Sequence, residues 1–165
     1  MKEVNIEENI ENRIIDLIIK GSEDRLIAFK PKEDTGSVDL VIKKRGDYTS
    51  KELSFQINIF IGHSKTESIV KNILQNNFIP SKDFYLMFIC FDEVKQDVSN
   101  IWIISSFMFS EIAELQKSED NKIILRFETT IVQEKKDKYA RFLIDKKNLG
   151  NFLLEIIKTK EFKNL

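Results

Sequence analysis

The sequence has little of what holds together small secreted domains or zinc sites. Its 165 residues include 1 cysteine, Cys90, and 1 histidine, His63. A single cysteine cannot form an intramolecular disulfide, and one cysteine with one histidine cannot supply the four ligands of a structural zinc site. These absences exclude disulfide scaffolds and zinc modules, and they favour a domain held together by its apolar core.

Long apolar runs and an excess of one charge are also missing. The longest apolar run, Phe84 to Phe91, is far shorter than the about 20 residues that cross a bilayer. The charged first residues do not resemble a signal peptide, so we expect a cytoplasmic protein that does not enter the membrane. With 26 Lys+Arg against 27 Asp+Glu, the formal net charge is −1. Any contact with nucleic acid must therefore come from a local basic patch.

Length and composition indicate one domain over residues 1–165. The hydrophobic share is 42% and includes 13 Phe, which is enough for a sizeable core. The chain has only 5 Gly and 2 Pro, and no stretch resembles a linker or an internal repeat. We expect a core over about residues 5–91 and a C-terminal elaboration over about 100–165.

Apolar periodicity predicts alternating helices and strands. The predicted helices cover residues 5–20, 64–75, 105–115 and 149–157. Ser64 and Glu67 form a capping box at the start of the second of these helices. The predicted strands cover residues 25–29, 38–43, 52–61, 84–91, 101–104, 122–130 and 139–145. The continuous apolar strand 84–91, which follows a crossover, indicates parallel pairing, so we expect an α/β fold with a mixed sheet flanked by helices.

Three polar features interrupt these patterns. Glu11 lies within the apolar arc of the first helix, and Asp39 lies in an apolar strand where a carboxylate is costly to bury. Gln56 and Asn58 are two residues apart on a strand and therefore point to the same side. Each feature also has an ordinary structural interpretation: a first-turn glutamate, an edge-strand aspartate, or the polar face of a half-buried strand.

Taken together, these features resemble the PD-(D/E)XK nuclease superfamily, which has the restriction-endonuclease-like fold. The helix carboxylate is followed by Asp39 in the run 36–41 (GSVDLV) and then by the polar-X-polar pair Gln56 and Asn58. The nearest likeness is to small archaeal and bacterial members whose third-strand motif reads Gln-X-Lys. The resemblance covers residue 8 to about residue 91, and the αβββαβ core of the family matches the predicted order of elements.

The resemblance implies a catalytic set of Glu11, Asp39, Gln56 and Asn58. Asp39 and Gln56 would hold Mg²⁺, and Glu11 would be an accessory carboxylate. The ion would activate a water and neutralise charge on the substrate phosphate. However, Asn58 stands where the family has its lysine, and an amide has no charge and cannot act as a base. Lys43 or Lys65 would have to replace that lysine.

Three functions stay open at this point. The first is a nuclease-lineage protein with a degenerate metal site that binds nucleic acid or a partner, with weak or no phosphodiester hydrolysis. The second is an active Mg²⁺-dependent DNA endonuclease with a relocated lysine, and the third is a protein-interaction domain without a nucleic-acid role. A basic patch of Lys43, Lys44, Arg45 and Lys65 would contact DNA, and the protein partner could be a second copy of the chain.

Overall fold

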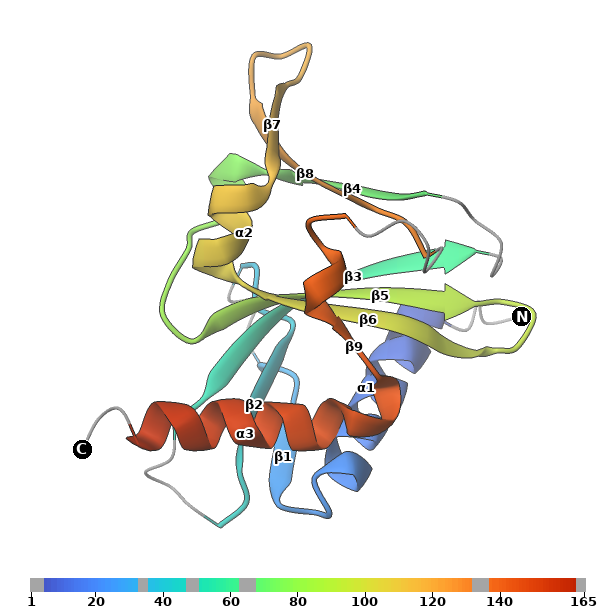
Figure 1. Ribbon diagram of the computed structural model, residues 1–165, viewed down its shortest axis with the longest axis vertical. Helices are drawn as coiled ribbons and strands as arrows, with labels where there is room; N and C mark the ends of the chain where they lie inside the picture. Colours follow the sequence, from blue (N-terminus) through green and yellow to red (C-terminus); the bar gives the residue numbers. More distant parts are fainter. Residues whose placement is uncertain (1–4, 33–35, 47–50, 63–67, 132–136, 163–165) are drawn as a thin grey trace.

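The computed structural model describes residues 5–32, 36–46, 51–62, 68–131 and 137–162 and contains two sheets and three helices (Figure 1). The helices are α1 (Ile6–Gly21), α2 (Ser106–Ile112) and α3 (Leu149–Phe162). The strands are β1 (Leu26–Phe29), β2 (Leu40–Lys44), β3 (Leu53–Gly62), β4 (Ile69–Leu74), β5 (Phe84–Asp92), β6 (Asp97–Ser105), β7 (Glu114–Lys117), β8 (Ile123–Thr129) and β9 (Leu143–Ile144).

The larger sheet has six strands in the order β1-β2-β3-β5-β6-β9. Strands β3 and β5 are parallel, with Ile57 opposite Met87, and the other neighbours are antiparallel. The prediction of an α/β fold with a mixed sheet, and of a parallel partner for the strand at 84–91, is confirmed. A second sheet has the order β4-β8-β7.

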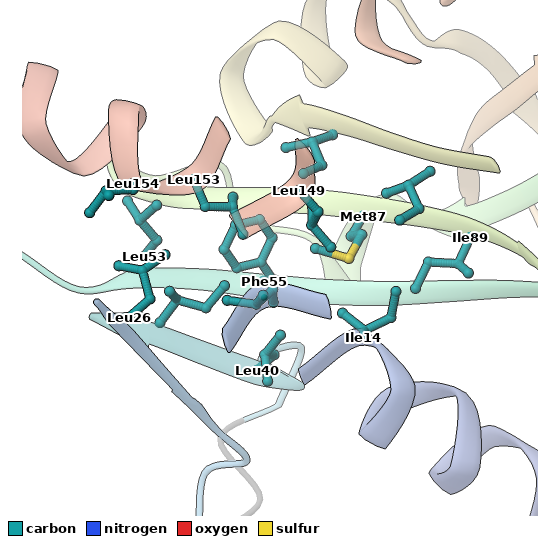
Figure 2. Close-up of a cluster of buried hydrophobic side chains, with 14 of the residues drawn as sticks. Ile14, Leu26, Leu40, Leu53, Phe55, Met87, Ile89, Leu149, Leu153 and Leu154 are labelled. Carbon is teal, nitrogen blue, oxygen red and sulfur yellow. The ribbon is translucent and has the colours of Figure 1, made fainter. Parts of the chain in front are cut away.

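Helices α1 and α3 cover one face of the larger sheet, and the second sheet and α2 cover the other face (Figure 1). The buried cluster beneath α1 and α3 contains Ile14, Phe55, Met87 and Leu153 (Figure 2). The cluster under the second sheet is aromatic. In it, the rings of Phe88 and Phe127 stack with their centroids 3.9 Å apart. Because both faces are covered, the central strands are buried on both sides.

The crossover between β3 and β5 contains a strand where a helix was predicted over residues 64–75. Residues 69–74 form β4, in which Ile69 pairs with Thr129 of β8. Ile69 and Ile73 are buried, while Val70 and Leu74 are exposed. A spacing of four residues keeps side chains on one face in a helix and also in a strand, so this pattern fits both periods. The capping box at Ser64 and Glu67 lies outside the described residues.

Two C-terminal predictions were also wrong in extent. The helix that begins after Ser105 ends at Ile112, and strand β7 follows it directly. The predicted strand 139–145 is reduced to Leu143–Ile144, and buried Tyr139 precedes it. The predicted start of α2 is right, because the Ser105 side chain accepts a hydrogen bond from Met108 N at 3.2 Å.

Candidate functional site

Asp39 lies where β2 separates from β3. The pairing of these strands ends with Leu40 opposite Phe55, and Asp39 N donates to Phe55 O at 2.8 Å. Beyond this point Ile57 N donates to Asp39 Oδ2 at 2.7 Å. The Asp39 carboxylate thus accepts a hydrogen bond that a backbone carbonyl of a paired strand would otherwise accept. It lies against the backbone of Ile57, between Gln56 and Asn58. The structure therefore brings the second-strand acid to the amide-bearing stretch of the third strand.

Gln56 and Asn58 point to the face covered by the second sheet. They alternate with Phe55 and Ile57, whose side chains pack in the cluster beneath α1 and α3. Asn58 is only 7% exposed, so the interpretation of this pair as an ordinary solvent face is wrong for Asn58. Gln56 Oε1 and Asn58 Nδ2 are buried and have no hydrogen-bond partner within the described part of the chain. Such groups cost about 1–3 kcal/mol each and call for an explanation.

Glu11 approaches the larger sheet from the opposite face. Its neighbours Ile10 and Ile14 pack in the cluster beneath α1, and its carboxylate forms a 2.7 Å ion pair with Lys30. Glu11 therefore does not join the two amides of the predicted catalytic set, since Gln56 and Asn58 leave the sheet on the other side. No pattern in the sequence pointed to Lys30, which directly follows β1.

Of the two lysines considered as replacements, Lys43 does not lie at Asp39. Lys43 Nζ lies 4.0 Å from Glu52 Oε1 and 5.7 Å from the centre of the Phe29 ring. Four residues of strand separate Lys43 from Asp39, which corresponds to about 13 Å. Lys65 lies outside the described residues. In the predicted basic patch, Arg45 Nε donates to Asp24 O at 2.9 Å, and Lys44 is the last residue of β2.

A polar hollow of about 380 Å³ adjoins Asp39. Its lining includes Ser37 and Val38, which precede Asp39, and Ser54, Lys82 and Asp83 at the beginnings of β3 and β5. It opens on the face of the sheet to which Gln56 points. The hollow therefore joins the site at the strand separation to the loop before β5.

Three lysines gather where β3 and β5 begin. Lys160 of α3 forms an ion pair with Asp83, and its amine lies 5.0 Å from the centre of the Tyr85 ring. Burial acts to lower the pKa of Lys160, but hydrogen bonds with Asp83 and Tyr85 raise it overall. Desolvation, then the nearby amines of Lys82 and Lys160, lower the pKa of Lys51. Sequence patterns missed this group, because its members come from three separate segments.

Two other titratable groups, Cys90 and Asp97, have structural roles. Burial raises the pKa of the Cys90 thiol to about 12, as expected for an inert core cysteine. Asp97 accepts hydrogen bonds from Arg13 and Lys146 at 3.1 and 3.0 Å, and these interactions, Arg13 foremost, lower its pKa to about 2.

The described residues contain no group of three or more histidines, cysteines and acids placed to hold a metal ion. Among the described helices, none is long and apolar enough to span a membrane.

Comparison with known proteins identifies the fold. No protein-family model matches the chain, and no curated protein sequence matches it. Among solved structures, a bacterial homing endonuclease, I-Ssp6803I, superposes with a TM-score of 0.56 at 14% sequence identity, over 99% of this chain and 99% of the endonuclease chain. The chain has a nuclease-like fold. This fold spans the described strands of both sheets, and the C-terminal elements are therefore part of it.

Proposed function

We propose that this protein belongs to the PD-(D/E)XK lineage and binds nucleic acid at the Asp39–Gln56 site, with weak or no phosphodiester hydrolysis. One observation carries the proposal: the Asp39 carboxylate is held by Ile57 N, between the two side chains of the polar-X-polar pair. The likeness to a homing endonuclease over the whole chain supports the same lineage. Fold alone does not define activity, so the proposal depends on the site.

The residues at this site fit a weakly held divalent cation. Gln56 Oε1 is a buried acceptor without a hydrogen-bond partner in the described chain, and it lies on the strand that holds the Asp39 carboxylate. Mg²⁺ prefers oxygen ligands and is commonly held by one or two carboxylates together with substrate phosphate. Asp39 and Gln56 would hold it with a single protein charge. When bound, the ion supplies Lewis-acid polarisation of the phosphate and a more acidic water.

The weak activity follows from Asn58. In the family pattern, a lysine at this position stabilises the charge that develops on the phosphate. Here the side chain is a neutral amide that is 7% exposed and whose Nδ2 has no partner among the described residues. Loss of one electrostatic stabiliser costs about 10²–10³ in rate. We therefore expect the protein to bind nucleic acid but to cleave it slowly or not at all.

Restoring the lysine tests this proposal. Asn58→Lys should raise Mg²⁺-dependent cleavage of supercoiled plasmid by about 10²-fold, and adding Asp39→Ala should remove the gain. Asn72→Lys, on the exposed side of β4, is the matched control and should leave cleavage unchanged. Thermal melting shows whether each variant is folded.

The wild-type protein provides a second measurement, because Asn58 is buried and Asn58→Lys could unfold. Mg²⁺ should increase the affinity of wild-type protein for duplex DNA, and Asp39→Ala should abolish that increase. No effect of Mg²⁺ on DNA affinity, together with no gain in folded Asn58→Lys, contradicts the proposal. Rapid cleavage by the wild type that Asp39→Ala abolishes would instead identify an active endonuclease. No DNA binding at low salt would favour a protein-interaction domain.

A further inference from the structure

The lysine group at the start of β3 and β5 carries more positive charge than the fold needs. Asp83 is the acid that forms an ion pair with Lys160. Lys51 and Lys82 lie on chain segments that meet at the start of β3 and β5, where Ser54 N donates to Asp83 O at 2.9 Å. Desolvation, then the amine of Lys82, lowers the pKa of Lys51. Like charges in contact are destabilising unless an anion compensates them. This placement is typical of a site for an anionic ligand.

The position of the group relates it to the Asp39 site. Lys82 is one of the residues that line the polar hollow adjoining Asp39. Lys51 lies two residues before the first residue of β3, and Gln56 lies five residues after Lys51 along the same chain segment. At about 3.3 Å per residue, this separation is roughly 17 Å, which is a few phosphate spacings of a nucleic-acid strand.

The acids near the hollow do not cancel this charge. Glu52 also lines the hollow, but its carboxylate faces Lys43 at 4.0 Å. The net charge of the whole chain is −1, so the local excess of lysine cannot reflect a generally basic surface. A local basic patch on a neutral protein is the feature that nucleic-acid binding requires here.

We propose that Lys51 and Lys82 bind backbone phosphates of duplex DNA that extends across the polar hollow to Asp39. The inference rests on the proposed function and identifies the surface that holds the nucleic acid. Such phosphate contacts provide binding affinity and fix the position of the protein on the duplex, but they do not recognise the base sequence.

Salt-dependent DNA binding tests the inference. Binding of a fluorescein-labelled duplex to the full chain is measured by anisotropy over a range of salt concentrations. Lys51→Gln combined with Lys82→Gln should weaken binding and lower the slope of log K against log salt by about 2, close to 1 per lysine. Lys117→Gln combined with Lys122→Gln removes the same charge from the β7–β8 hairpin, which projects from the far side of the molecule (Figure 1). This control should keep the wild-type slope.

The outcomes separate this inference from the proposed function. If wild-type protein binds DNA and the two double variants behave alike, the lysine surface is wrong while the Asp39 site stands. If the Lys51 and Lys82 variant loses binding but Asp39→Ala has no effect with or without Mg²⁺, the lysine surface stands and the Asp39 site is wrong. If wild-type protein does not bind duplex DNA at low salt, both are wrong.

Discussion

The polar residues of β3 show most clearly how single side chains conflict with the stability of this fold. Gln56 and Asn58 lie on a strand whose other residues, apart from Ser54, are not polar, and each keeps a buried amide atom without a hydrogen-bond partner in the described chain. Apolar side chains at these positions would remove that cost. The presence of the two amides at these positions is understandable if the site binds a ligand, because binding sites commonly break local rules of folding.

A second residue-scale feature is the acid that links α1 to the sheet. Asp97 has a pKa of about 2, below its ordinary 3.8, because Arg13 and Lys146 stabilise its charged form. A lowered pKa in the folded state contributes stability above about pH 4, and this contribution is lost as pH falls toward 2. Asp97→Asn should therefore lower the free energy of unfolding at pH 7 by about 1 kcal/mol, since the groups are partly exposed.

The pH profile of stability checks this prediction. Urea unfolding between pH 7 and pH 2 should show a smaller loss of stability for Asp97→Asn than for wild type. Asp16→Asn, at an exposed position of α1, is the control and should follow the wild-type profile. Parallel curves for Asp97→Asn and wild type would contradict the assigned role of Asp97.

Among the elements, the first three strands and the crossover show what sequence periodicity can and cannot determine. Strict alternation in β3 predicted the strand and also the shared face of Gln56 and Asn58. For β4, two buried isoleucines four residues apart fit a helix and a strand equally, and pairing with β8, whose residues lie 50 to 60 positions later, decided between them. The position of Asp39 against β3 could be predicted, because the two strands are neighbours along the chain. The lysine group depends on contacts between distant segments, so no local sequence pattern predicts it.

The packing of α1 against α3 depends on two glycines that face each other, Gly21 and Gly150. A Cβ added at Gly150 would lie 2.3 Å from Ile18 O and 2.4 Å from Ser22 N, both backbone atoms that cannot move aside without shifting α1. Gly150→Ala should therefore destabilise the protein by roughly 3 kcal/mol, at the upper end for overpacking. Thermal or urea unfolding measures this loss. Asn151→Ala, at the next and exposed position of α3, should change stability little, and equal effects of the two substitutions would show that the helices are not in close contact.

For the whole molecule, the arrangement of layers explains how a chain of net charge −1 can present the proposed nucleic-acid site. Helices α1 and α3 occupy one face, the second sheet occupies much of the other, and the polar hollow opens between β2 and the loop before β5. Local charge, not total charge, then determines where a phosphate backbone can lie. The superposition with a homing endonuclease over 99% of the chain agrees with one continuous nuclease-like fold.

Binding of Mn²⁺ to the folded protein in the presence of duplex DNA tests the central claim most directly. Titration followed by electron paramagnetic resonance should give weak binding in the wild type, tighter binding in Gln56→Glu, because a carboxylate replaces an amide ligand, and no specific binding in Asp39→Asn. Gln116→Glu on β7 adds the same charge away from the site and should match the wild type. Mn²⁺ binding of equal strength in all four proteins would contradict the account.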